Sequence, residues 1–279
     1  MKLVIALVLL TAGSVVFHFV SPWWFTPLAS NWSDIDDTIN ITFWVTGAVF
    51  VAVNFFLAYC VYRFRYQKGQ RSHYEPENKK LELWLTAITS LGVILMLAPG
   101  LSVWAKFVDV PEDAKQVEVL GQQWQWGFRF PGEDGELGKV DALFISQTNP
   151  FGLDPNDIKG QDDVIVNDNE VHLPINQNYK ALLRSKDVLH NFAIPQFRVK
   201  MDLVPGIVTY LWFEATKLGR FDILCMELCG IAHHTMRGQM VIDSEEGFRQ
   251  WLNQQPTFRE TQEGKPGDLA TGKNLYAVC

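Results

Sequence analysis

The stretch Cys225-Met226-Glu227-Leu228-Cys229-Gly230-Ile231-Ala232-His233-His234-Thr235-Met236 restricts the fold and chemistry of this chain more than any other. Two thiols, two imidazoles and a thioether lie within these twelve residues. Nitrogen and sulfur ligands of this kind select copper over hard cations. A mononuclear copper site needs a single cysteine, whereas a second cysteine four residues later allows two thiolates to bridge two metal ions. Strand-like residues 219–224 and 238–242 flank the stretch, so we expect a rigid loop between two strands.

A further ligand is expected from outside the loop, and His190 is the candidate, 35 residues before Cys225. With His190 included, the sequence resembles subunit II of the haem–copper cytochrome c oxidases. That family carries a dinuclear copper centre (CuA) on a C-x-x-x-C-x-x-x-H-x-x-M loop, together with an upstream histidine in a D-V-x-H stretch. Both patterns are present here.

The resemblance implies a complete set of metal ligands. In the family the two cysteine sulfurs bridge both copper ions, each copper has one histidine, and methionine and a backbone carbonyl are weak distal ligands. Register from Cys229 selects His233 rather than His234. The expected metal-binding residues are His190, Cys225, Glu227 through its carbonyl, Cys229, His233 and Met236. The resemblance also implies that the Glu227 carboxylate reaches a Mg²⁺ or Mn²⁺ ion at the junction with subunit I, and a hard carboxylate suits a hard cation.

Two other uses of the loop stay open from the residues alone. Cys225 and Cys229 could form a disulfide in an oxidising compartment, which would leave the histidines and the methionine without a role. A zinc site would use cysteine and histidine but has no use for Met236. The thioether therefore favours copper over both alternatives.

The charge of the chain divides it into two unlike parts. Residues 1–108 hold eight Lys/Arg and six Asp/Glu, whereas residues 109–279 hold sixteen and twenty-five. We interpret the first part as membrane-embedded and the second as a soluble acidic domain. An acidic domain is poorly suited to nucleic acid, which basic patches bind. It suits a basic protein partner, although ordinary acidic solubility explains the charge equally well.

The membrane part is predicted to be a helical hairpin over residues 38–108, with spans at 39–61 and 83–107. Each span is long enough to cross a hydrocarbon core of about 30 Å. Basic residues lie between the spans and place that connection in the cytoplasm: Arg63, Arg65, Lys68, Arg71, Lys79 and Lys80. The metal loop is then on the periplasmic side of a bacterial plasma membrane. Residues 1–24 are either a signal peptide or an additional span; the run of 18 apolar residues and its poor cleavage site favour a span.

Glu82 begins the second span, where an ionisable group at a membrane is costly and often functional. Residues 80–84 resemble the K-L-E-x-x-W segment of the same family, whose glutamate lies at the mouth of a proton path into subunit I. This chain has one residue fewer between Glu82 and Trp84 than that pattern. A glutamate at the membrane interface with no functional role is the alternative.

Residues 109–250 are predicted to form an all-β, cupredoxin-like Greek-key domain, because many short strand-like runs alternate with Pro, Gly and Asn turns. Trp124, Trp126, Phe128 and Phe130 share one parity, so a strand would place them on one face and Arg129 on the other. Residues 121–126 resemble the aromatic stretch beside the copper centre of the family. That resemblance implies Trp124 as the point at which electrons arrive from cytochrome c.

Residues 251–279 form a tail whose last part, 267–279, resembles the opening helix of a c-type cytochrome. We interpret it as the start of a fused cytochrome c domain that is truncated at Cys279; a chance tail ending in a free cysteine is the alternative. Haem attachment requires a second cysteine and a histidine, so no haem is expected in the chain as printed.

The implied function is that of the CuA-bearing subunit of a respiratory cytochrome c oxidase. Electrons from cytochrome c would pass through the copper centre to haem in subunit I, where oxygen is reduced to water. The implied partners are subunit I, subunit III, cytochrome c and membrane lipid. The complete ligand set argues against a quinol-oxidising subunit II, and the six histidines and apolar spans argue against nitrous-oxide reductase. A CuA-containing subunit of a nitric-oxide reductase remains as the alternative.

Overall fold

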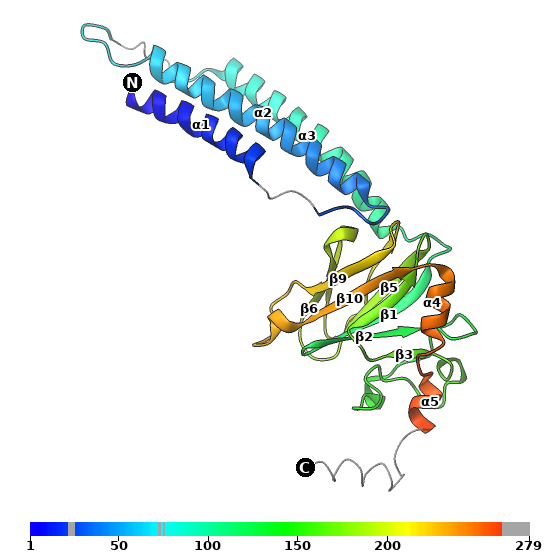
Figure 1. Ribbon diagram of the computed structural model, residues 1–279. Coiled ribbons are helices and arrows are strands. Elements are labelled where there is room, and N and C mark those ends of the chain that lie inside the picture. Colours follow the sequence, from blue (N-terminus) through cyan, green and yellow to red (C-terminus); the bar gives the residue numbers. More distant parts are fainter. Residues whose placement is uncertain (22–25, 72–73, 75, 264–279) are drawn as a thin grey trace. The chain divides into compact units, whose positions relative to one another are not determined.

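The computed structural model describes residues 1–21, 26–71, 74 and 76–263 (Figure 1). The chain divides into two compact units. One comprises Met1–Thr26 and Ser33–Lys106, and the other comprises Pro27–Trp32 and Phe107–Cys279. The predicted opening helix of a cytochrome c domain, at 267–279, lies outside the described residues.

Three helices make up the first unit: α1 (Lys2–Val20), α2 (Ser33–Arg63) and α3 (Lys79–Val108). Each has the length and apolar composition needed to cross a membrane, and almost none of their residues is buried within the chain. Apolar side chains that face outward in this way match a lipid environment, because lipid offers them no hydrophobic penalty. The N-terminal apolar helices predicted from the sequence are therefore present.

Helix α1 packs antiparallel to α2. Its last turn contacts the N-terminal half of α2, with ring centroids 6.4 Å apart for both His18–Phe43 and Phe19–Trp44. Met1, just before the start of α1, contacts Arg65 just beyond the C-terminal end of α2. Whether residues 1–24 are retained in the mature protein stays a prediction, and part of the aromatic segment that ends this stretch, 22–25, lies outside the described residues.

The second unit is a sandwich of two five-stranded sheets (Figure 1). The first has the order β3-β2-β1-β5-β8 and the second β4-β10-β9-β6-β7. Large side chains from both inner faces fill the core, among them Phe128, Leu183, Phe192 and Phe213, each at most 1% exposed. The strands are β1 (Lys115–Gln122), β2 (Gln125–Phe130), β3 (Val164–Val166), β4 (Glu170–Pro174), β5 (Asn178–Ser185), β6 (His190–Ile194), β7 (Val199–Leu203), β8 (Thr209–Glu214), β9 (Gly219–Cys225) and β10 (Arg237–Asp243).

The aromatic stretch before residue 130 differs from expectation. Residues 115–130 form a hairpin of β1 and β2, and Trp124 lies in its turn rather than on a strand. Trp126, Phe128 and Phe130 do share a buried face. Arg129, expected on an outward face, is only 3% exposed. The alternation fails because the opposite face of β2 is covered as well.

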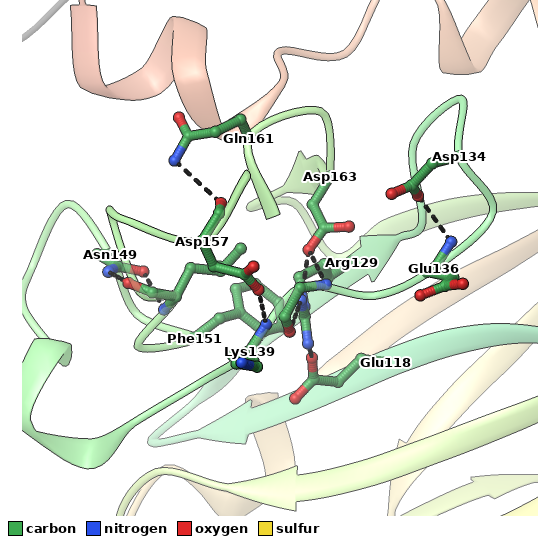
Figure 2. A network of polar contacts seen from close by, with 12 residues as sticks. Glu118, Arg129, Asp134, Glu136, Lys139, Asn149, Phe151, Asp157, Gln161 and Asp163 are labelled. Carbon is green, nitrogen blue, oxygen red and sulfur yellow. Dashed lines mark hydrogen bonds and ion pairs between the residues drawn. The ribbon is translucent and has the colours of Figure 1, made fainter. Parts of the chain in front are cut away.

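Part of the cover over Arg129 comes from the segment between β2 and β3 (Figure 2). Arg129 forms ion pairs with Glu118 on β1 and with Asp163 just before β3. It also donates to the carbonyl of Gly138 at 3.0 Å. Arg184 on β5 makes a second ion pair with Glu118. The charges are satisfied by partners from four parts of the chain, which is the condition for burying them.

Two short helices follow β10: α4 (Glu245–Leu252) and α5 (Phe258–Glu263). Ser244 caps α4 by accepting a hydrogen bond from the Gly247 amide at 3.1 Å. Trp251 stacks on His172 of β4 with centroids 4.6 Å apart. Phe258 is 1% exposed and joins the core cluster around Phe151. Packing against the sandwich therefore continues past residue 250.

Candidate metal centre

The two halves of the expected ligand set meet at one end of the second sheet. His190 is the first residue of β6, and Cys225 is the last residue of β9. These strands are antiparallel neighbours, with Phe192 opposite Cys225. The sheet register therefore brings two residues that are 35 positions apart to the same end of the sheet. The loop from Met226 to Met236 starts at this end and leads into β10.

Two cysteine sulfurs lie at the centre of the group. Their Sγ atoms are 3.8 Å apart, far beyond the S–S bond length of about 2.05 Å, so the two thiols are free. His190 Nδ1 lies 3.9 Å from Cys225 Sγ, and His233 Nδ1 lies 3.5 Å from Cys229 Sγ. One imidazole thus faces each sulfur. His190, Cys225 and Cys229 alone already form a group that could hold a metal ion.

Two weaker donors complete the surroundings of the sulfurs. Met236 Sδ lies 3.9 Å from Cys229 Sγ, and the Glu227 carbonyl oxygen lies 3.3 Å from Cys225 Sγ. His233 belongs to the short helix η4 (His233–Thr235), whereas His234 on the same helix is exposed. The residue selected by register is therefore the one that faces the sulfurs.

This donor set fits a soft metal ion. With a metal–thiolate bond of about 2.3 Å, two sulfurs on one metal can be at most about 4.6 Å apart. The observed 3.8 Å lies within that limit. The set includes both a thioether and thiolates, which favours copper over zinc. The sequence alternatives of a disulfide and a zinc site thus fit less well than copper.

Burial of the site controls the protonation of its thiols. The pKa of Cys229 is raised to about 11, mainly by burial, with the hydrogen bond and proximity to Cys225 acting in the same direction. Without a cation this thiol keeps its proton at neutral pH. A bound metal would supply the positive charge that favours the thiolate, and binding would release the proton.

Asp187, which the sequence analysis did not single out, orients the first ligand. Its Oδ1 lies 2.8 Å from His190 Nε2, so His190 donates from Nε2 and its Nδ1 is left to face Cys225. Backbone amides of Gln123 and Val188 also donate to this carboxylate, both at 2.7 Å. Burial acts to raise the pKa of Asp187, but these hydrogen bonds outweigh it and the pKa is lowered. A ligand histidine held by a carboxylate is a recurrent arrangement in metal sites.

The turn between β1 and β2 covers the metal loop. The Gln123 side chain donates from Nε2 to the Cys229 carbonyl at 2.7 Å. Trp124 lies against Gly230, where an added Cβ would be 3.1 Å from the indole Cζ2. Gly230 also has a φ of +129°, which L side chains rarely adopt. The indole therefore rests directly on the segment between Cys229 and His233.

A second tryptophan supports the histidine side. Trp126 on β2 packs edge-on against His190, with centroids 6.5 Å apart, and against Phe192 at 5.5 Å. It is 1% exposed. Gly121 on β1 leaves room for the His190 ring, because an added Cβ would lie 3.2 Å from its Cδ2. The histidine is thus held from the first sheet as well as from its own.

For two of the expected site residues, Glu82 and the Glu227 carboxylate, the structure tests neither the proton path nor the second metal ion. Glu82 lies exposed in the first turn of α3. The Glu227 carboxylate belongs to the metal loop and, among the described residues, no cluster of three His, Cys, Asp or Glu ligands includes it.

The fold and the site together define a class: a membrane-anchored β-sandwich protein of the cupredoxin kind, with a buried thiol–imidazole–thioether metal site at one end of a sheet. The model of the periplasmic domain of cytochrome c oxidase subunit II matches residues 115–244. The chain is 56% identical to an alternative cytochrome c oxidase subunit 2 of Bradyrhizobium diazoefficiens, over 92% of this chain and 93% of that protein. It belongs to the family of cytochrome c oxidase subunit II.

More distant relatives have the same name. The chain is 27% identical to cytochrome c oxidase subunit 2 of Cereibacter sphaeroides, over 82% of this chain and 77% of that protein. The crystal structure of the periplasmic domain of subunit II (CoxB) of Bradyrhizobium japonicum is 27% identical and covers 52% of this chain and 95% of that one, with a TM-score of 0.38. The relatives are subunits of cytochrome c oxidases, so the alternative of a nitric-oxide reductase is not favoured.

Proposed function

We propose that this chain holds a dinuclear copper centre and passes electrons from cytochrome c to subunit I of a cytochrome c oxidase. The observation that carries the proposal is the pair of free thiols 3.8 Å apart with one imidazole facing each. Two equivalent thiolate–imidazole halves are what two metal ions need in order to share charge evenly. The proposed ligands are His190, Cys225, the Glu227 carbonyl, Cys229, His233 and Met236.

Copper bound there would supply a one-electron carrier. The role of the protein is to keep the ligands in place in both oxidation states, because any rearrangement of ligands slows electron transfer. Several rigid contacts support this role. Cys225 is fixed by the β6–β9 ladder, His190 by Asp187, and the loop by the hydrogen bond from the Cys225 amide to the Met236 carbonyl at 3.3 Å.

The surface around the loop supports a protein partner. Leu228 and Ile231 are 77% and 92% exposed, although both are large and apolar. Exposed apolar side chains grouped on one loop are typical of a surface that another protein covers. Trp124, in contact with the metal loop, is the proposed point at which an electron arrives from a docked cytochrome c. The acidic charge of the domain suits a basic donor.

The remaining expectations extend this proposal to the membrane complex. The Glu227 carboxylate would contribute to a Mg²⁺ or Mn²⁺ site whose other ligands come from subunit I. Glu82 would lie at the opening of a proton path in subunit I. The basic connection between α2 and α3 supports a periplasmic position for the metal domain of a bacterial plasma-membrane complex. Subunit III and lipid would also surround the helices.

Electron paramagnetic resonance of the full chain, purified in detergent and loaded with copper, tests the centre. One electron shared by two copper ions gives a seven-line hyperfine pattern. A four-line mononuclear spectrum, or no copper uptake, would contradict the proposal. The variant Cys229→Ser should lose the seven-line pattern, because one of the two bridging thiolates is gone.

Stopped-flow oxidation of reduced cytochrome c tests Trp124. The variant Trp124→Ala in the assembled oxidase should slow electron transfer at unchanged copper content. Trp124→Phe keeps an aromatic ring over Gly230 and should lose less. An unchanged rate in Trp124→Ala would remove this residue from the path.

A further inference from the structure

Gln123 makes contacts to both halves of the metal site. The His190 half stands on β6, whereas Cys229 lies in the loop beyond the end of β9. The main-chain amide of Gln123 donates to Asp187 Oδ2 at 2.7 Å, and the other oxygen of Asp187 holds His190. The side chain of the same residue donates to the Cys229 carbonyl at 2.7 Å. One residue thus joins the histidine half to the loop half.

The neighbours of Gln123 make this link stiff. Trp124 rests on Gly230, the residue after Cys229. On the other side, the Lys186 amide donates to the Gly121 carbonyl at 3.0 Å, and Lys186 Nζ donates to Gln122 Oε1 at 3.0 Å. The β1–β2 turn is therefore fastened both to the segment before His190 and to the loop that follows Cys225.

We propose that Gln123 is a positioning residue that fixes the loop half of the copper site against the histidine half. This inference rests on the proposed dinuclear centre and adds the residue that sets the relation between its two sides. The hydrogen bond to the Cys229 carbonyl immobilises the tip of the loop, which lies beyond the sheet ladder. Without it, Cys229 and His233 would move relative to Cys225 and His190, and the two sides of the centre would no longer be equivalent.

The side-chain bond can be removed separately from the main-chain bond. Gln123→Met has a similar length and no donor, and its backbone amide still reaches Asp187. Gln123→Glu keeps the shape but places an acceptor against the Cys229 carbonyl. Gln125→Met is the matched control, because Gln125 lies exposed two residues away at the start of β2. Gln123 is also at the surface, so these variants should still fold and unfold cooperatively in urea, with a midpoint only slightly below that of the native chain.

Hydrogen exchange in the full chain without metal gives the first measurement. Amides of the loop residues 226–236 should exchange between about twofold and tenfold faster in Gln123→Met, the range that corresponds to loss of one neutral hydrogen bond. In Gln123→Glu the increase should be at least as large. Gln125→Met should match the native chain.

The copper-loaded chain gives the second measurement. Transfer of copper to a chelator should be about tenfold faster in Gln123→Met, as for other partners of metal ligands, and the hyperfine pattern should lose its even sharing between two ions. If Gln123→Met and Gln123→Glu match Gln125→Met in both measurements, the inference is wrong. If the loop amides exchange faster in Gln123→Met but the native chain gives no dinuclear spectrum, the positioning role stands and the proposed copper function fails.

Discussion

Replacing Arg129 by methionine should destabilise the β-domain more than any change on its surface. Arg129 forms ion pairs with Glu118 and Asp163 (Figure 2). Arg129 is 3% exposed, and these two partners are 2% and 0% exposed. After the change Glu118 keeps Arg184 as a partner. Asp163 does not keep a cation: its Oδ2 retains only the Gly138 amide, at 3.0 Å, and its Oδ1 has no hydrogen-bond partner among the described residues.

The expected loss follows from stranding this buried carboxylate. Removing one partner of a buried ion pair costs about 3–5 kcal/mol of unfolding free energy. For a domain of roughly 150 residues, each kcal/mol lowers Tm by about 2–4 °C, so Tm should fall by about 6–20 °C. The control is Arg249→Met, which breaks an exposed i,i+4 pair with Glu245 and should cost less than about 1 kcal/mol.

The loss should also depend on pH in a defined direction. Burial raises the pKa of Asp163 to about 6, although the charge of Arg129 and the Gly138 hydrogen bond act to lower it. A carboxyl whose folded pKa exceeds its unfolded value stabilises the fold fully below the unfolded pKa and loses that stabilisation as pH rises through the folded pKa. In the native chain this loss is about 3 kcal/mol between pH 4 and 6. Arg129→Met removes a positive charge that lowers the pKa of Asp163. The loss of unfolding free energy in this variant, relative to the native chain, should therefore be larger at pH 8 than at pH 5.

Thermal unfolding of the full chain in detergent, followed by near-ultraviolet circular dichroism, measures both effects. The double variant Arg129→Met/Asp163→Asn should recover part of the loss at pH 8, because the stranded charge is then absent. Equal deficits at pH 5 and pH 8, or a deficit no larger than that of Arg249→Met, would refute the assignment of a buried charge at Asp163.

Three shorter predictions follow from other contacts. Asp187→Ala should weaken copper binding about 10- to 100-fold by freeing His190 Nε2; competition with a copper chelator measures this, and an unchanged affinity would show that His190 is oriented without Asp187. Gly230→Ala should cost about 1–3 kcal/mol in urea unfolding, because its φ of +129° disfavours a side chain and the Cβ meets Trp124; a native midpoint would argue against that contact. Ser244→Ala should cost about 1 kcal/mol by removing the cap of α4, and no change in the midpoint of urea unfolding would show that the cap contributes nothing.

Much of the metal site could be predicted from sequence because its ligands are local. Five of the six expected donors fall within Cys225–Met236, and their spacing follows from one loop between two strands. Helices α1, α2 and α3 could be predicted for a similar reason, since a continuous apolar run signals a span without reference to the rest of the chain. The two strands that flank the loop, β9 and β10, agree with the expected 219–224 and 238–242 to within one residue at each end, whereas the turn at Trp124 was not expected.

The residues that hold the ligands could not be found in this way. Asp187 is close to His190 in sequence, and its presence in the D-V-x-H stretch was the available signal. Gln123 contacts the Cys229 carbonyl across 106 positions, so no local pattern points to it. The alternation of β2 predicted the wrong environment for Arg129, because whether the second face of a strand meets water depends on what covers it. Here that cover comes from residues 131–163.

By itself, the sequence determined the chemistry of this protein: a soft metal-binding loop, an upstream histidine and apolar anchors, all encoded by residue type and short-range spacing. The tertiary structure alone decided how those groups are held. Antiparallel pairing of β6 with β9 brings His190 to Cys225, and the β1–β2 turn closes over the loop through Gln123 and Trp124. Hydrogen bonds and packing act over a few ångströms between residues that can be a hundred positions apart, so these contacts exist only once the two sheets have formed.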